Sequence, residues 1–161
     1  MIILAIDPGY ERLGIAILEK EPKGKETLIH SECFKTLSKD PHPIRLGQIH
    51  DYIEKIIETY KPKVLSIETL FFQNNAKTAM QVSESRGAII SLCASKDIKV
   101  FEYTPLQIKS AVTGNGKSDK VQIQKMIPIL IKLDELKTIK HDDEYDAIAC
   151  GLTYFACNPV R

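Results

Sequence analysis

Apolar residues near the start of the chain form short continuous runs separated by polar turns. The first run spans residues 2–6, the second spans 15–18, and residues 26–34 can form a third. Continuous apolar runs of this length are typical of strands that are covered on both faces of a sheet. Because the connections between the runs are short, we expect the three strands to form an antiparallel meander.

The pattern changes its period between residues 44 and 60, where apolar side chains recur every three or four positions. This spacing predicts an amphipathic helix that packs one face against the sheet. Further strands are expected at 64–68 and 98–103, with a long helix over 76–96 between them. Strands connected through helices run parallel. The pattern therefore predicts an α/β fold whose five-stranded mixed sheet has three antiparallel strands and two parallel ones, flanked by helices.

The last third of the chain is expected to be helical. A short helix is predicted over 106–112, with Pro105 in its first turn. Ser118 is a suitable cap for a second helix that continues to about residue 133, and Pro128 should bend or interrupt this helix. A final helix over 141–156 has an apolar stripe, formed by Tyr145, Ile148, Leu152 and Phe155.

Composition narrows the class of protein further. The chain has 161 residues, 43% of them hydrophobic, and a formal net charge of +1. These values suit one domain over residues 1–161. No apolar run is long enough to span a bilayer, and the N-terminus lacks the features of a signal peptide. The four cysteines show no CxxC spacing, so we expect reduced thiols in a cytoplasmic protein.

Two acidic residues follow apolar strands at the ends where open α/β sheets place their sites. Asp7 ends the first strand and Glu68 ends the fourth. If these two strands are parallel neighbours, the two carboxylates lie close together at one edge of the sheet. The alternative for Asp7 is a local role, in which its side chain only initiates the turn at Pro8 and Gly9.

The final helix adds a cluster of acids at its first turn, namely Asp142, Asp143, Glu144 and Asp146. Residues three or four apart share a helical face, so Asp146 can pair with either Asp143 or Asp142. These acids could also serve only to stabilise the helix dipole. Four converging carboxylates would need a cation, and oxygen ligands select Mg²⁺ or Mn²⁺. Two such ions suit in-line displacement at phosphorus.

Six short motifs follow one another along the chain: Ile6-Asp7-Pro8-Gly9 with Gly14, Ile67-Glu68 with Phe71-Phe72, Ser85-Arg86-Gly87-Ala88, Phe101-Glu102-Tyr103-Thr104-Pro105, Thr113-Gly114-Asn115-Gly116-Lys117, and Asp143-Glu144-Tyr145-Asp146-Ala147-Ile148-Ala149. In this order they resemble the RuvC family of Holliday-junction resolvases. The resemblance covers nearly the whole chain.

The resemblance implies a ribonuclease-H-like fold and a homodimer that cuts two strands of a four-way DNA junction by symmetric nicks. It implies that the catalytic and metal-binding acids are Asp7, Glu68, Asp143 and Asp146, and so favours Asp143 over Asp142. Two Mg²⁺ ions per subunit are expected, with Mn²⁺ as a substitute, and the products should carry 5′-phosphates. The family acts with a branch-migration motor in recombination and repair.

Candidate DNA contacts lie in three places. Phe71 and Phe72 follow Glu68 in an apparent loop, where an exposed aromatic ring could stack on an unpaired base; the alternative is that both are core residues. A locally basic stretch around a glycine loop suits phosphate contacts, although such lysines are often only solvated. The family resemblance favours Phe71 as a wedge and Lys109 and Lys120 as phosphate contacts, with Lys117 adjacent and Arg86 on the long helix.

Two other functions are compatible with these residues. A ribonuclease-H-like nuclease acting on RNA would have a similar acidic site, and substrate preference would distinguish it. A non-catalytic module that binds junctions is the alternative outside the enzymes. The presence of all four acids argues against such a module, and an assay with and without Mg²⁺ would separate the two.

Overall fold

The computed structural model describes residues 1–70, 76–133 and 139–159. The described residues form a five-stranded sheet with the strand order β3-β2-β1-β4-β5. Its strands are β1 Ile2–Asp7, β2 Arg12–Glu19, β3 Thr27–Lys35, β4 Val64–Glu68 and β5 Lys99–Tyr103. Neighbouring strands β1, β2 and β3 are antiparallel, whereas β4 is parallel to both β1 and β5. The predicted mixed sheet is therefore confirmed, including the placement of β4 beside β1.

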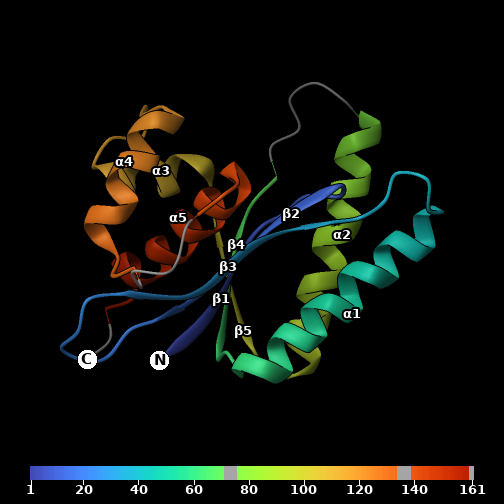
Figure 1. The fold of residues 1–161 in the computed structure, drawn as a ribbon, viewed down its shortest axis with the longest axis horizontal. Helices are drawn as coiled ribbons and strands as arrows, with labels where there is room; N and C mark the ends of the chain where they lie inside the picture. The colour runs from blue at the N-terminus through green and yellow to red at the C-terminus, as the bar shows by residue number, and fades with distance from the viewer. Residues whose placement is uncertain (71–75, 134–138, 160–161) are drawn as a thin grey trace.

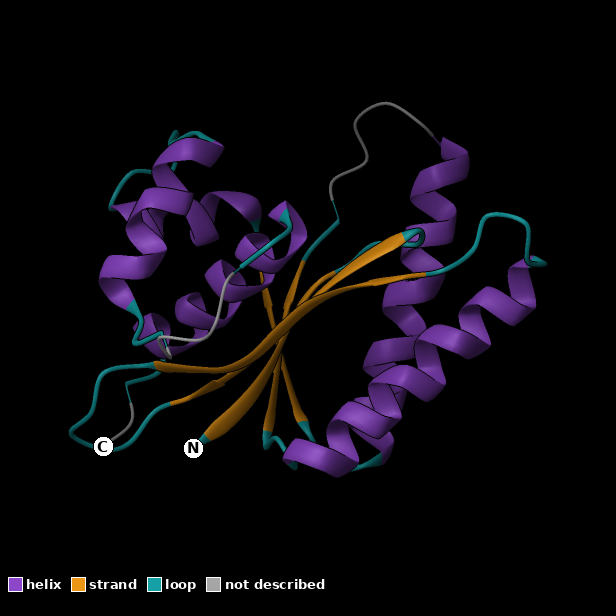
Figure 2. Cartoon of the chain, in the orientation of Figure 1, coloured by secondary structure: helices purple, strands orange, loops and turns teal. Residues whose placement is uncertain are grey.

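Helices cover both faces of this sheet (Figures 1 and 2). On one face lie α1 His42–Tyr60 and α2 Ala76–Ser95. On the other face lies α5 Asp142–Cys157, with α3 Pro105–Thr113 and α4 Lys120–Leu130 packed beside it (Figure 1). No helix in the described part of the chain is long and apolar enough to cross a membrane.

The two helical layers bury separate apolar cores because successive strand residues point to opposite faces. In β1, Leu4 and Ile6 join the core beneath α1 and α2, while Ile3 and Ala5 join the core beneath α5. All four side chains are fully buried. This explains why the first apolar run is continuous rather than alternating, since a strand covered on both faces needs apolar residues at every position.

The N-terminal cap of α4 differs from the prediction. Asp119 rather than Ser118 is the cap, and its side chain accepts a hydrogen bond from the Gln122 N–H at 2.8 Å. The Gln122 side chain accepts one from the Asp119 N–H in return, which completes a capping box. Ser118 is buried instead, with its hydroxyl 2.6 Å from that of Thr113.

The C-terminal end of α4 also differs. The helix continues past Pro128 but ends at Leu130, short of the predicted residue 133. The chain becomes extended at Ile131, and the Lys132 N–H donates to the Glu26 carbonyl at 2.7 Å. Pairing with the start of β3 therefore replaces the last helical turn.

The final helix is more deeply buried than a one-faced amphipathic pattern predicts. Along α5, every residue from Ala147 to Phe155 is buried, while Tyr145 is only half-buried rather than part of the buried stripe. The cause is that α5 lies between the sheet and the helices α3 and α4.

Candidate active site

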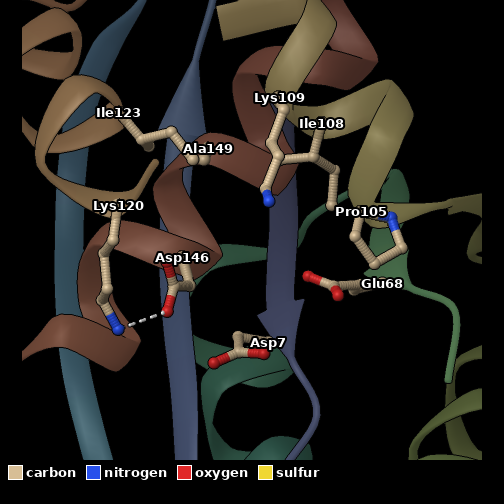
Figure 3. A pocket seen from close by; sticks show the side chains of 9 residues that line it. All are labelled: Asp7, Glu68, Pro105, Ile108, Lys109, Lys120, Ile123, Asp146 and Ala149. Carbon is tan, nitrogen blue, oxygen red and sulfur yellow. Dashed lines mark hydrogen bonds and ion pairs between the residues drawn. The ribbon is translucent and has the colours of Figure 1, made fainter. Parts of the chain in front are cut away.

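Three acids from three different elements line one cavity of about 260 Å³ (Figure 3). Ile6 pairs with Ile67 in the parallel register of β1 and β4, so the next residues, Asp7 and Glu68, end neighbouring strands at the same edge. Asp146 reaches the cavity from the first part of α5. The remaining lining residues are Pro105, Ile108, Lys109, Lys120, Ile123 and Ala149.

Gly14 permits α5 to approach the strands this closely. It lies opposite Asp7 in the antiparallel register of β1 and β2. A Cβ atom at Gly14 would overlap the carbonyl oxygen of Asp143 and lie 3.0 Å from the Asp7 Cβ. Only glycine therefore allows the N-terminus of α5 to pack directly against β2 at the position beside Asp7.

Burial and mutual repulsion favour the protonated forms of the two strand acids, Asp7 and Glu68, in the absence of a cation. Burial raises the pKa of Asp7 to about 8, with further contributions from the charges of Asp146, Glu68 and Asp143. Burial and the charge of Asp146 raise the pKa of Glu68 to about 7, and the nearby ammonium group of Lys109 opposes this shift. Ionising both acids near neutral pH is therefore unfavourable without a compensating positive charge.

Asp146, which lines the cavity, and Asp143, whose charge acts on Asp7, are both paired with cations of the chain itself. Lys120 Nζ lies 3.1 Å from Asp146 Oδ2; burial nevertheless raises the pKa of Asp146 overall. Arg12 Nε donates to Asp143 Oδ2 at 2.9 Å. Burial is the largest single influence on the pKa of Asp143 and raises it, but the hydrogen bonds from Arg12, the main chain and Cys33, together with the charge of Arg12, lower the pKa overall.

The other two acids of α5 lie outside the cavity. Asp142 is exposed, accepts a hydrogen bond from Gln124 Nε2 at 3.0 Å, and lies 3.4 Å from Lys120 Nζ, so it shares this lysine with Asp146. Glu144 is buried, and its carboxylate accepts from the Ser31 hydroxyl at 2.7 Å and from the His141 N–H at 3.0 Å. Of these four acids of α5, only Asp146 lines the cavity, whereas Asp143 lies close enough to Asp7 for its charge to raise the pKa of that carboxyl.

The donor atoms suit Mg²⁺ or Mn²⁺, because the cavity offers carboxylate oxygens and no histidine or cysteine. The raised pKa values of Asp7 and Glu68 fit a site completed by a cation. Within residues 1–70, 76–133 and 139–159, no three acid, histidine or cysteine side chains are grouped closely enough to hold a metal ion. In this arrangement Asp143 and Asp146 are instead paired with Arg12 and Lys120.

The candidate DNA contacts fall in different surroundings. Lys109 and Lys120 extend from α3 and α4 toward the carboxylates (Figure 3). Lys117 is exposed in the loop between these helices. Phe71 and Phe72 lie outside the described residues, so the proposed base-stacking wedge stays a prediction.

Arg86 is occupied by protein groups. Its Nε donates to the main-chain carbonyl of Glu68 at 3.1 Å, and its Nη2 pairs with the carboxylate of Glu102. The sequence suggested Arg86 only as a DNA contact, and it gave no indication of Arg12 at all. The partner of Arg12 lies 131 residues further along the chain, so no local spacing connects the two.

The fold and the acidic cavity define a nuclease of the ribonuclease-H-like class, and comparison with known proteins specifies the family. Residues 3–154 match the family model described as crossover junction endodeoxyribonuclease RuvC. The curated RuvC of Petrotoga mobilis is 45% identical over 155 residues, covering 96% of this chain and 93% of the relative. That of Finegoldia magna is 41% identical over 154 residues, covering 96% and 92%. The chain belongs to the RuvC family of crossover junction endodeoxyribonucleases.

Solved structures agree with this assignment. The structure of Thermus thermophilus RuvC aligns with a TM-score of 0.87 at 28% identity, covering 99% of this chain and 98% of that one. The same protein in complex with a Holliday junction substrate aligns with a TM-score of 0.85, covering 96% and 92%. The predicted family, the ribonuclease-H-like fold and the nuclease class are thus confirmed.

Proposed function

We propose that this chain is a metal-dependent endonuclease that resolves four-way DNA junctions during recombination and repair. The observation that carries this proposal is the cavity where carboxylates from β1, β4 and α5 meet beside two lysines. A negatively charged backbone phosphate can enter such a site only if cations offset the acids. The relative from T. thermophilus, whose structure includes a Holliday junction substrate, supports the choice of DNA.

Asp7, Glu68, Asp143 and Asp146 would hold two Mg²⁺ ions per subunit, with Mn²⁺ as a substitute. When bound, such ions lower the pKa of an attacking water and stabilise the charge on the leaving 3′ oxygen, so that 5′-phosphates result. The chain itself supplies the position of the acids at the sheet edge. Lys109 and Lys120, which line the same cavity, would contact the phosphates on either side of the scissile bond.

We further propose that the active form is a homodimer acting in the cytoplasm. Two sites related by a two-fold axis would cut two symmetry-related strands, as a four-way junction requires. By family resemblance the dimer would act with a branch-migration motor. Phe71 would stack on an unpaired base at the junction centre, and Phe72 and Lys117 would be further DNA contacts.

The test is cleavage of a labelled four-way junction beside a linear duplex of the same sequence and an RNA–DNA hybrid, each with Mg²⁺ or with EDTA. We expect paired symmetric nicks that are confined to the junction and require Mg²⁺. Cutting of the RNA strand would retain the metal site but change the substrate. Tight junction binding without cutting would identify a binding module and contradict the proposed enzyme.

A further inference from the structure

The peptide group that follows Glu68 is held at both of its polar atoms. Its N–H, which belongs to Thr69, donates to the Tyr103 carbonyl of β5 at 2.9 Å. Its carbonyl, which belongs to Glu68, accepts from Arg86 Nε at 3.1 Å. A peptide group bound on both sides has little freedom to rotate, and the direction of the Glu68 side chain depends on that rotation.

Arg86 is itself held in place by a second contact. Its Nη2 pairs with the carboxylate of Glu102, which is paired with Ile67 in the register of β4 and β5. The guanidinium group is a rigid fork, so one side chain can engage the carbonyl and the carboxylate at the same time. Arg86 therefore bridges the end of β4, which places Glu68 in the cavity, and the neighbouring strand β5.

Arg86 reaches this edge from the face of the sheet opposite the cavity. It belongs to α2, whereas the cavity is lined by residues of α3, α4 and α5 on the other face (Figures 1 and 3). Its side chain is only 17% exposed. A phosphate contact needs donors that project into solvent. Two donors of Arg86, Nε and Nη2, point at protein groups instead.

The preceding residue of α2 makes a parallel contact. The Ser85 side chain is fully buried, and its hydroxyl donates to the Gly9 carbonyl at 3.0 Å, in the turn that follows Asp7. One position of α2 thus holds the turn after β1, and the next holds the end of β4. Both strands that deliver an acid to the cavity are fixed from the same point of α2.

From this geometry we propose that Arg86 is a positioning residue, which fixes Glu68 for metal binding through the Glu68 main chain and does not contact DNA. This inference rests on the proposed function. It replaces the DNA contact that the sequence suggested for Arg86. Removing a residue that orients a metal ligand lowers metal affinity or activity by about 10–100-fold.

The experiment compares Arg86→Gln, Arg86→Lys and Glu102→Gln with the wild-type protein. Three quantities are measured: junction affinity in EDTA as a function of salt, the single-turnover cleavage rate as a function of Mg²⁺, and Mn²⁺ binding without DNA by electron paramagnetic resonance. Thermal melting verifies that each variant is folded at the assay temperature. If the wild-type protein itself does not cut the junction, the proposed function fails, independently of Arg86.

We expect Arg86→Gln to leave junction affinity and its salt dependence unchanged, while Mn²⁺ binding weakens and the half-saturating Mg²⁺ concentration rises by about 10-fold or more. Arg86→Lys should behave like Arg86→Gln, because a lysine keeps the charge but loses the fork. Glu102→Gln should shift the metal dependence in the same direction by a smaller factor.

A phosphate contact predicts a different set of results. Arg86→Gln would then weaken binding and reduce the slope of affinity against salt by about one ion, and Arg86→Lys would restore both. Glu102→Gln would tighten binding by releasing Arg86. Any of these outcomes, or an unchanged metal dependence in all three folded variants, would overturn the proposal.

Discussion

The acids contributed by the strands and those contributed by α5 differ in their ion pairs, although burial raises the pKa of Asp146 as well. Burial and neighbouring carboxylates raise the pKa of Asp7 to about 8 and that of Glu68 to about 7. Asp143 and Asp146 instead accept hydrogen bonds from Arg12 and Lys120. The strand acids are thus arranged at a cost that a metal ion would offset, while the helix acids already have cations that a metal ion must displace.

This difference follows from the element that carries each acid, a strand end for Asp7 and Glu68 and a helix for Asp143 and Asp146. A carboxylate at the end of a central strand is surrounded by sheet and helices, so its charge is poorly solvated. Near the start of α5, by contrast, long basic side chains reach the acids, Arg12 at Asp143 and Lys120 at Asp146. The strand acids should therefore determine whether a metal binds, and the helix acids should adjust how tightly it binds.

The largest expected effect is that of Asp7→Asn. Without the central carboxylate, the several kcal/mol that bound metal supplies to the transition state are lost, and junction cleavage should fall by about a thousandfold or more. Single-turnover assays on a labelled junction measure this. Asp142→Asn is the comparison on α5: this exposed carboxylate does not line the cavity and touches it only through Lys120, so the variant should retain most activity. Equal cleavage by wild type and Asp7→Asn would contradict the assignment of the strand acids.

Gly14→Ala tests whether activity requires the acids of α5 to lie close to the strand acids. The added Cβ would overlap the Asp143 carbonyl, so we expect a loss of about 1–3 kcal/mol in the free energy of unfolding. Cleavage by the protein that remains folded should fall by about 100-fold, because α5 is displaced from β1. Thermal melting and cleavage assays measure the two effects.

Gly47→Ala provides the control for that substitution. Gly47 lies within α1, and no atom lies within 4 Å of the position that its Cβ would occupy. Alanine there should leave cleavage unchanged and stabilise the helix slightly. If both alanine variants behaved alike, the close approach at Gly14 would have no functional role.

The strand acids also predict how stability depends on pH. Their pKa values in the folded protein lie above those of the unfolded chain, so the folded state binds more protons between about pH 4 and pH 8. In EDTA, their contribution therefore lowers the melting temperature as the pH rises through this range. Each kcal/mol corresponds to about 2–4 °C for a chain of this size. Mg²⁺ should stabilise the protein more at higher pH.

Asp7→Asn isolates the contribution of the strand acids to this profile. The variant should melt at a higher temperature than the wild type near pH 8 in EDTA, and its melting temperature should depend less on pH. It should also gain little from Mg²⁺. If the melting temperatures of the two proteins changed with pH in parallel, ionisation of the strand acids would not destabilise the metal-free protein.

The smallest expected effect concerns Arg12, on the helix side of the comparison. Arg12→Gln removes a cation that competes for Asp143, so the half-saturating Mg²⁺ concentration should fall, by no more than about fivefold for an exposed pair. Titration of cleavage rate against Mg²⁺ measures it. Lys96→Gln, which removes the exposed pair with Glu54 far from the cavity, is the control. A higher Mg²⁺ requirement for Arg12→Gln would mean that Arg12 supports the metal site.

The sequence predicted the sheet and the meeting of Asp7 with Glu68 because both depend on local rules. Strand periodicity, short connections and a helical crossover together place two strand ends at one edge. The choice between Asp142 and Asp143 could not be made from spacing, since both lie within one helical turn of Asp146. The family resemblance favours Asp143, and the surroundings of the two acids are set by tertiary contacts such as the one from Arg12, 131 residues away from Asp143.

The cap residue of α4 and the contacts of Arg86 could not be predicted from the sequence for the same reason. Ser118 and Asp119 are both good cap residues, and burial of Ser118 against Thr113 decides between them. The sequence shows Arg86 only as a basic residue in one of the motifs, because its partners lie on β4 and β5. Tertiary contacts of this kind have no periodic signature.

The most direct test of the account is calorimetric titration of Mn²⁺ into the DNA-free protein near neutral pH, in two buffers of different ionisation enthalpy. The account predicts binding accompanied by proton release, because the metal displaces protons from Asp7 and Glu68. Both the heat and the released protons should be lost in Asp7→Asn. Binding of equal strength in Asp7→Asn, or binding without proton release, would contradict the claim that the buried strand acids form the metal site.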